Sequence, residues 1–410
     1  MKTTGDQQLV KRINRSVLMR LLRNQPGRSR AQLANDSGLT KSTVSLLVRE
    51  LIDEGWFSEI RMAAANGVGR PSTPLQIDDR SRGLIGVEVA VDTLRVASVS
   101  LLGQVLWSTQ EPLRSTRPRD VCSRIAQLTV AAQEQLVSRG AQLSGVGIGL
   151  PGAFDETTGV VRFAPNLGWR NVDFLPQITQ ALVHAGLPPV PVHVQNEADT
   201  AALSEYEFSE NDGRDSLIFV SCDVGVGAGI VLNDRLFTGM RGMAGEIGHS
   251  VLELDGPACS CGRRGCAEAF IGSGALGQLA NARRSGHYLG VLLQNLWTTF
   301  DPSVLVVGGA SCHHFPEMVK VARETLQNYA TDAGVTAPTV RAARYGLLAS
   351  AVGAAALVLH RYLRPMHPSA RHGATATWPA TRRLPRRRRP RASPPAHSRP
   401  ALTRISASTR

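Results

Sequence analysis

One short stretch of this 410-residue chain combines residue types that hold a metal ion. It contains one histidine and three cysteines: His249, Cys259, Cys261 and Cys266. The spacing H-x9-C-x-C-x4-C supplies one imidazole and three thiolates, which complete a tetrahedral shell around Zn²⁺ and leave no position open for a substrate. Gly262 and Gly265 permit the tight loop that the spacing needs. The pattern predicts a structural zinc site, and the regular spacing argues against three reduced cysteines beside an unrelated histidine.

Helix signals crowd the first eighty residues. A helical apolar period ends at Pro26-Gly27, and Ser29 with Gln32 forms a capping box for a second, short helix. Thr40 caps a third helix. The inner face of that helix repeats at i, i+3, i+4 and i+7: Val44, Leu47, Val48 and Leu51. Two short helices joined by a glycine-containing turn predict a helix-turn-helix, followed by a two-stranded wing over residues 56–61 and 72–77.

The outer face of the third helix carries small and basic side chains. Those that can reach base edges and phosphates in a major groove are Lys41, Ser42, Thr43, Ser45 and Arg49. At the wing, Gly69-Arg70-Pro71 holds Arg70 on a stiff, narrow turn suited to a minor groove, although an ordinary solvated turn fits it equally well. A small helical packing module is the alternative to DNA binding for the whole head.

Net charge is distributed unevenly along the chain. Of the overall charge of +13, eleven arginines in residues 367–410 leave +2 for the rest, and residues 1–49 carry +8. A basic head on an acidic middle places specific DNA contact in the first fifty residues. The N-terminus lacks a secretory pattern, and the longest apolar run, near residues 349–359, is too short to span a bilayer. We therefore expect a cytoplasmic protein without membrane contact.

From residue 84 the pattern changes to short apolar strands that alternate with helices. We expect a helix around residues 121–139 and strands at 84–89, 94–101, 146–150, 192–194, 217–220, 229–232 and 304–307. This alternation favours sheets covered by helices, arranged in two lobes with a cleft between them.

The last segment is rich in Arg, Pro and Ser and poor in large apolar residues, which predicts disorder. The chain accordingly divides into a winged helix-turn-helix domain (1–80), a two-lobed domain with the metal loop (81–365) and a disordered Arg/Pro-rich tail (366–410).

These motifs resemble the ROK family, which groups sugar kinases with sugar-responsive repressors. The matching stretches are Gly245–His249 with the three cysteines, Gly147–Gly152, Pro165–Trp169, Asn196–Asp199, and Asp301-Pro302 leading to Gly308-Gly309. The winged head resembles the repressor branch. The resemblance implies an α/β fold, with a two-lobed sugar-kinase-like domain of the actin/hexokinase type preceded by an all-helical winged helix-turn-helix domain.

The resemblance also implies a sugar site. In family members the sugar hydroxyls are held by side chains that fall here on Asn196, Glu197, Glu246, His249 and Glu268. Carboxylates accept hydrogen bonds from hydroxyl groups, and an imidazole tied to zinc through one nitrogen is fixed in orientation at the other. Support of the metal loop is the alternative role for Glu246 and Glu268.

The positions that a kinase on this scaffold needs are altered. Where the family's first phosphate loop reads Asp-x-Gly-Gly-Thr, this chain has Glu88-Val89-Ala90-Val91-Asp92. The second loop keeps its glycines but has Asp223 and Val224 in place of Gly and Thr. At the kinase base position stands Glu197, one methylene longer than the family's Asp, and a displacement of about 1 Å costs about 100-fold in rate. We expect sugar binding without ATP turnover, hence no enzyme.

Together these features predict a sugar-responsive transcriptional repressor. It would bind operator DNA as a homodimer or dimer of dimers, and a small sugar or sugar phosphate in the cleft would change the spacing of the recognition helices. A residual ATP-dependent sugar kinase with a DNA-binding head is one alternative, and a non-specific nucleoid-type binder is another. Compared with the family, the stretch 274–301 is short, with an apparent loss around 283–287.

Overall fold

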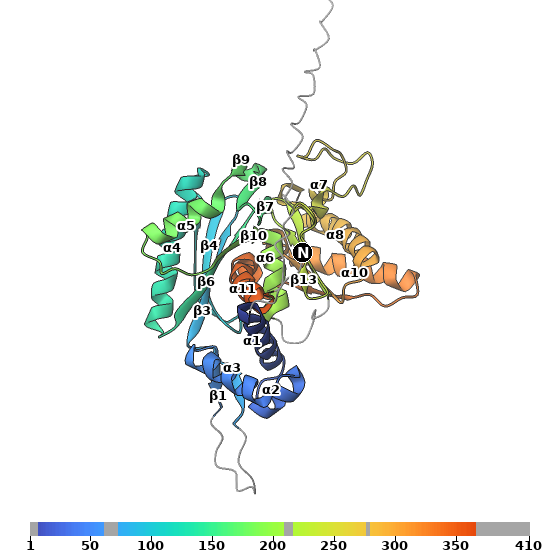
Figure 1. The fold of residues 1–410 in the computed structure, drawn as a ribbon. Helices are drawn as coiled ribbons and strands as arrows, with labels where there is room; N and C mark the ends of the chain where they lie inside the picture. Colours follow the sequence, from blue (N-terminus) through green and yellow to red (C-terminus); the bar gives the residue numbers. More distant parts are fainter. Residues whose placement is uncertain (1–6, 61–72, 209–215, 276–278, 366–410) are drawn as a thin grey trace, which may run out of the picture. The chain divides into compact units, whose positions relative to one another are not determined.

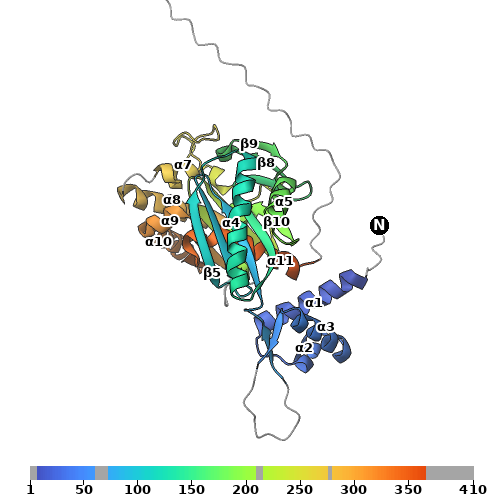
Figure 2. The same ribbon diagram turned by 90° about the vertical axis from the view of Figure 1, so that its left-hand side faces the viewer.

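The computed structural model of the chain describes residues 7–60, 73–208, 216–275 and 279–365. These residues form a small head and a larger body with two main sheets (Figure 1, Figure 2). The predicted tail, residues 366–410, and the predicted wing residue Arg70 lie outside the described residues.

The head follows the predicted pattern of caps. Its elements are α1 (Gln7–Asn24), α2 (Arg30–Ser37), α3 (Lys41–Asp53), β1 (Phe57–Glu59) and β2 (Leu75–Ile77). The Ser29 hydroxyl accepts from the Gln32 amide at 3.3 Å, while the Ser29 amide donates to Gln32 Oε1 at 2.9 Å, so the capping box is confirmed. Thr40 Oγ1 accepts from the Thr43 amide and begins α3. Because β1 and β2 pair antiparallel as the base of a wing, the head is not all-helical.

The two lobes repeat one topology. The first sheet has the order β10 (Val192–Asn196), β6 (Gln142–Leu150), β3 (Arg82–Val89), β4 (Thr93–Ser100) and β5 (Val105–Pro112). The second has the order β13 (Arg235–Leu236), β12 (Val226–Leu232), β11 (Ser216–Cys222), β14 (Val304–Gly308) and β15 (Thr339–Ala342). In each sheet the first three strands of the chain are antiparallel neighbours and the next two join in parallel. The predicted mixed α/β lobes are therefore confirmed.

Some short strands escaped the sequence analysis. They are β13, β15 and a three-stranded sheet of β7 (Ala153–Asp155), β8 (Val160–Ala164) and β9 (Trp169–Val172). All of them have five residues or fewer, too short for a clear period of two.

Helices form three layers with the two main sheets. The outer helices are α4 (Pro118–Ser138) and α5 (Phe174–His184) on the first sheet, and α8 (Leu279–Phe300) and α10 (Pro316–Asp332) on the second. Between the sheets lie α6 (Glu197–Phe208) and α11 (Ala349–Leu363), which pack closely together (Figure 1). The expected loss at residues 283–287 falls inside α8, which runs through it as one helix.

Glycines allow α11 to approach the first sheet and α6 closely. A Cβ atom at Gly86 of β3 would lie 1.8 Å from the carbonyl oxygen of Ala351, and one at Gly353 would lie 1.6 Å from that of Thr200. Any side chain at these positions would separate the layers. By length and composition alone Gly346–Leu363 could cross a membrane, but 72% of it is buried inside the protein. We therefore interpret α11 as a core helix.

Candidate metal centre, ligand site and nucleic-acid interface

The four predicted metal ligands come together in the structure. The ligand atoms of His249, Cys259, Cys261 and Cys266 all lie within 4.8 Å of one another. Cys261 Sγ is 3.7 Å from Cys266 Sγ, and Cys259 Sγ is 3.8 Å from His249 Nδ1. Zinc–sulfur bonds of about 2.3 Å at tetrahedral angles place ligand atoms about 3.8 Å apart. The four residues therefore fit one tetrahedral divalent ion, with Nδ1 as the imidazole ligand.

The loop that carries these ligands folds back on itself. It begins after the 3₁₀ turn η2 (Ile247–His249), and Val251 then forms an isolated antiparallel bridge with Cys266. Gly265 has φ +69°, and a Cβ atom there would lie 1.5 Å from the carbonyl oxygen of Glu253. The predicted need for glycine in the loop is thus confirmed at this position, because only glycine tolerates both the conformation and the close approach.

The thiols differ in their surroundings. Hydrogen bonds from Arg263, first from its backbone N–H, lower the pKa of Cys261 to about 6. Burial and the neighbouring thiols raise the pKa of Cys266 to about 12. Since a thiolate and not a thiol is the metal ligand, Cys261 supplies the first negative charge, and a bound cation would favour ionisation of the others.

Glu268 joins the cysteine loop to a pocket. It is the first residue of the short helix α7 (Glu268–Ile271). Its Oε1 accepts from Ser260 Oγ at 2.9 Å and lies 3.8 Å from Cys259 Sγ. A pocket of about 290 Å³, lined by Val224, Ser260 and Glu268 among others, opens at this point. Glu268 is thus placed both to support the metal loop and to face a ligand.

Asn196 and Glu197 stand where β10 meets α6. Asn196 Oδ1 accepts from the Ala198 amide at 2.7 Å and so satisfies one of the free N–H groups at the start of the helix. Asn196 Nδ2 donates to the carbonyl oxygen of Gly152 at 3.1 Å and to Glu197 Oε2 at 2.9 Å. The two predicted sugar-binding side chains are therefore held against each other at the first turn of α6.

Several carboxyl groups share the space around Glu197. Burial raises the pKa of Glu197 well above its ordinary value, and the carboxylates of Glu88, Glu246 and Asp223 raise it further. Burial also raises the pKa of Glu246, and the neighbouring Glu268 acts in the same direction. The predicted sugar-binding carboxylates are thus close enough to influence one another, and their number favours a partner rich in hydroxyl donors.

One acidic residue near this site had no role in the sequence analysis. Asp199 is only 4% exposed, and its Oδ1 has no hydrogen-bond partner within the described part of the chain. Burial raises its pKa well above the ordinary value, and Glu156 and Glu246 add to the shift. An acidic residue in a helix turn of otherwise small residues, such as Ala198, Ala201 and Ala202, was the signal that could have identified it.

The two loops that would face nucleotide phosphates are filled by side chains of the protein itself. At the end of β3, Glu88 accepts from Arg95 Nη1 at 2.9 Å and is buried. After β11, Asp223 Oδ1 accepts from the Ala310 amide at 2.6 Å and its Oδ2 from Ser221 Oγ at 2.8 Å. Phosphate binding at such loops needs free backbone N–H groups. Asp223 occupies one of them and brings a negative charge to the same place.

The outer face of α3 is open to solvent. Lys41, Ser42, Ser45 and Arg49 are exposed, while Thr43 is half-buried and bonded to Thr40. Leu46, 56% exposed in the middle of this face, was missed by the sequence analysis. Its position, four residues after Ser42 and three before Arg49, could have placed it there. An exposed leucine on a recognition helix is suited to contact the methyl group of thymine.

Charge counting overstated the free basic charge of the head. Of the ten basic side chains in residues 1–49, six form ion pairs within the described part of the chain: Lys11 with Glu50, Arg15 with Glu54, Arg20 with Asp234, Arg23 with Glu207, Arg28 with Asp36, and Arg30 with Glu59. Five of the six acidic partners lie beyond residue 49, so a count over residues 1–49 cannot include them. Lys41 and Arg49 take part in none of the ion pairs among the described residues, so the α3 face keeps its positive charge.

The head is a helix-turn-helix, and the body has two lobes of one topology with a Cys₃His cluster beside several carboxyl groups. This combination is typical of a regulator that joins a DNA-binding domain to a ligand-binding domain. The profile of the ROK family matches residues 84–284 and 277–361, and that of the IclR helix-turn-helix domain matches residues 17–58. The chain belongs to the ROK family.

Known relatives include both repressors and kinases. The xylose repressor of Bacillus subtilis (strain 168) is 28% identical over 385 residues, which cover 88% of this chain and 98% of the repressor. The glucokinase of Thermotoga maritima is 35% identical over 195 residues, 47% of this chain and 58% of the kinase. A solved ROK family transcriptional regulator, a homologue of the E. coli MLC protein, shares the fold with a TM-score of 0.68 at 24% identity, over 87% of this chain and 97% of its own.

Proposed function

We propose that this chain is a sugar-responsive transcriptional repressor. Residues 1–80 bind operator DNA, and residues 81–365 sense a small sugar or sugar phosphate. The observation that carries the proposal is the exposed polar and basic face of α3, presented by a helix-turn-helix on a sugar-kinase-like body. The match to a xylose repressor over 98% of that protein supports the same function.

Zinc is the metal we assign to the Cys₃His cluster, because three thiolates and one imidazole suit Zn²⁺ and leave no open position. The ion would hold the loop and fix the ring of His249, whose second nitrogen is then free to meet a sugar hydroxyl. Asn196, Glu197, Glu246 and Glu268 would accept or donate the remaining hydrogen bonds to the sugar.

The protein is a non-enzymatic regulator. The xylose repressor of Bacillus subtilis matches 88% of the chain, whereas the glucokinase of Thermotoga maritima matches 47% of it. Asp223 and Glu88 occupy the loops that a nucleotide needs, which gives this assignment a physical reason.

Binding of duplex DNA with and without sugars tests the proposal. Duplexes selected from genomic fragments are titrated with purified full-length protein by fluorescence anisotropy, alone and with D-xylose, D-glucose or N-acetylglucosamine. We expect selected duplexes to bind at least 1000-fold more tightly than random ones, as is typical of specific recognition (about 10³–10⁷-fold). One of the sugars should change that affinity.

Arg49→Ala sharpens the test at the recognition helix. Loss of one base contact costs about 1–3 kcal/mol and relaxes selectivity at one position, while loss of one phosphate contact reduces the salt slope by about one. Arg119→Ala, a change at an exposed arginine of the body, is the matched control and should leave binding unchanged. Equal affinity for random and selected duplexes would instead support the nucleoid-type alternative.

We further propose that the protein works in the cytoplasm as a homodimer or dimer of dimers. Two-fold symmetry would place two α3 helices in successive major grooves, and the operator would then be pseudo-palindromic. Sedimentation of the protein with and without a selected duplex measures the assembly, and a monomer bound to a single half-site would contradict it.

A further inference from the structure

Helix α6 connects the predicted sugar site to the head. It begins at Glu197, which is one of the predicted sugar-binding residues, and ends at Phe208. Twelve residues at a rise of 1.5 Å make it about 18 Å long. Ten of the twelve residues are buried, so the helix cannot move without displacing its neighbours.

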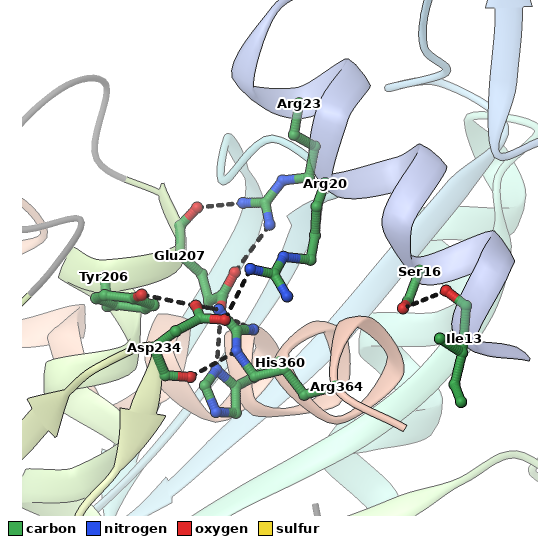
Figure 3. A network of polar contacts seen from close by, with 9 residues as sticks. All are labelled: Ile13, Ser16, Arg20, Arg23, Tyr206, Glu207, Asp234, His360 and Arg364. Atoms are coloured by element: carbon green, nitrogen blue, oxygen red, sulfur yellow. Dashed lines mark hydrogen bonds and ion pairs between the residues drawn. The ribbon is translucent and has the colours of Figure 1, made fainter. Parts of the chain in front are cut away.

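The far end of α6 is a junction of three helices. Glu207 is buried, and its carboxylate accepts from Arg23 Nη1 of α1 at 2.8 Å, from Arg364 Nη1, just after α11, at 2.7 Å, and pairs with His360 Nδ1 of α11 at 2.7 Å (Figure 3). Arg23 also donates to the backbone carbonyl of Glu207. Burial alone would raise the pKa of Glu207, but the positive charge of Arg364, the hydrogen bond with His360 and the positive charge of Arg23 hold it well below its ordinary value. The carboxylate is therefore charged and tied to the head.

A second group of polar contacts lies beside the first. Asp234, in the turn between β12 and β13, pairs with Arg20 of α1 at 2.9 Å and accepts from the Tyr206 hydroxyl at 2.7 Å (Figure 3). Arg364 contacts both Asp234 and Glu207, so it bridges the two groups. Helix α1 is thereby attached to the end of α6 and to the second sheet at once.

Apolar contacts also connect the head to α6 and α11. Trp56 of the head stacks on Tyr362 of α11, with ring centroids 4.4 Å apart and an interplanar angle of 18°. The buried side chains of the head and those along α6 and α11 belong to one cluster, which includes Leu18, Phe208 and Leu357. Head and body are in fact part of one compact unit, Met1–Ser369.

The near end of α6 is fixed to α11. Thr200 Oγ1 lies 3.0 Å from Ser350 Oγ, and the close approach at Gly353 leaves no room between the helices. A displacement of the first turn of α6 is therefore transmitted to both helices as a unit, because packed interiors do not deform continuously.

We propose that α6 and α11 form one rigid pair that couples the sugar site to the DNA-binding head, and that Glu207 is the positioning residue that passes the change to α1 through Arg23. The inference rests on the proposed function, since it concerns regulation of the same DNA-binding surface. A sugar bound at Asn196 and Glu197 changes the position of α6 between the two sheets. Because Glu207 of α6 is paired with Arg23 of α1, the orientation of the head depends on that position. Coupling of this kind is a free-energy difference between two arrangements, typically a factor of 5–150 in affinity.

Arg23→Gln and Glu207→Gln test the coupling in the full-length zinc-loaded protein. The matched control is Glu205→Gln, because Glu205 is equally buried on the same helix but its ion pair is with Arg341 of the body. For each protein we would measure the affinity for the selected duplex with and without the sugar that acts on the wild type. Sugar affinity is measured directly by calorimetry.

We expect the sugar-dependent ratio of DNA affinities to be at least about fivefold in the wild type and in Glu205→Gln. It should fall below about twofold in both junction variants, while sugar affinity stays within about threefold of the wild type. Arg23→Gln lies on the less buried side of the junction and keeps the test valid if Glu207→Gln fails to fold. Junction variants with the full wild-type ratio would overturn the proposal.

Hydrogen exchange of the α1 amides, without DNA, separates this inference from the proposed function. Sugar should change exchange over Gln7–Asn24 in the wild type and in Glu205→Gln, and not in Arg23→Gln. That result together with unselective DNA binding would refute the repressor function and keep the coupling. Selective, sugar-responsive DNA binding with unchanged α1 exchange would do the opposite.

Discussion

The cysteine loop and the turns after β3 and β11 are neighbouring parts of the body that differ in the ligands they can bind. The cysteine loop after η2 gathers four ligand atoms within 4.8 Å and presents Glu268 to a pocket. The turns after β3 and β11 lie at equivalent places in the two sheets, and side chains of the protein occupy both. Glu88 pairs with Arg95, and Asp223 accepts a hydrogen bond from the Ala310 amide. The two parts touch, since the Ser273 amide donates to the Asp223 carbonyl oxygen.

This difference separates binding from catalysis on one scaffold. A sugar sensor needs a shaped pocket with polar groups of fixed orientation, which the metal loop would provide if it holds the proposed ion. Phosphoryl transfer also needs a cradle for the phosphates, and a carboxylate in that cradle repels them. The following changes would break or sharpen the contrast, beginning with the largest expected effect.

Removal of one metal ligand should have the largest effect. Cys266 is fully buried, so in Cys266→Ser we expect bound zinc to fall from one per chain to below about 0.1 and sugar affinity to fall at least about tenfold, because the loop loses its only fixed centre. Elemental analysis and calorimetry measure the two quantities. Cys122→Ala, a buried cysteine of α4, is the control. Retention of a full zinc complement by Cys266→Ser would contradict the assignment.

Ionisation of Glu88, which occupies the loop after β3, should change the stability of the protein with pH. Burial raises the pKa of Glu88 to about 7, against 4.5 for an ordinary glutamate, although Arg95 opposes the shift. The folded protein therefore holds this proton more tightly than the unfolded chain, and the resulting stabilisation, complete below pH 4.5, is lost as the pH rises to about 7.

Glu88→Gln should remove this loss. Between pH 5 and pH 8 the free energy of unfolding of the wild type should fall by roughly 2.5 kcal/mol more than that of the variant. Urea denaturation at both pH values measures the difference. Glu111→Gln, at an exposed ion pair with Arg124, is the control and should follow the wild type. Parallel curves for Glu88→Gln and the wild type would show that Glu88 ionises normally.

Removal of the Asp223 side chain from the loop after β11 should improve nucleotide binding. In Asp223→Gly the Ala310 amide becomes free and a negative charge is removed, so affinity for AMPPNP should rise at least about tenfold, as expected for one hydrogen bond to a charged group. Calorimetry measures the gain. Ser221→Ala removes the other hydrogen bond of Asp223 but leaves the amide occupied, so it should gain nothing. Equal affinity in Asp223→Gly and the wild type would mean that Asp223 does not block the site.

The smallest effect concerns the link between the metal loop and the pocket. Ser260→Ala removes the 2.9 Å hydrogen bond to Glu268 and should weaken sugar binding about twofold to fivefold, because one solvent-exposed hydrogen bond contributes about 0.5–1 kcal/mol. Ser250→Ala, in the same loop, is the control. A loss above about 30-fold would instead make Ser260 a direct sugar ligand.

Much of the head and of the metal loop was predictable because their contacts are local. The capping box of Ser29 and Gln32 spans three residues, and the cysteine cluster spans the eighteen positions from His249 to Cys266. Apart from the short β13 and β15, the strands of the main sheets were predictable from apolar runs. The strands of the small sheet were not, since three to five residues carry too little periodicity.

Residue types and short spacings alone determined that this chain has a helix-turn-helix and a Cys₃His cluster, and the resemblance to the ROK family identified the altered phosphate loops. Tertiary structure alone decided which charges are available and how the parts are joined. Arg23 and Glu207 lie 184 residues apart, and each reads as an ordinary charged helix residue. The physical reason is that an ion pair depends on distance in space, which chain order does not encode until the two sheets have packed around α6 and α11.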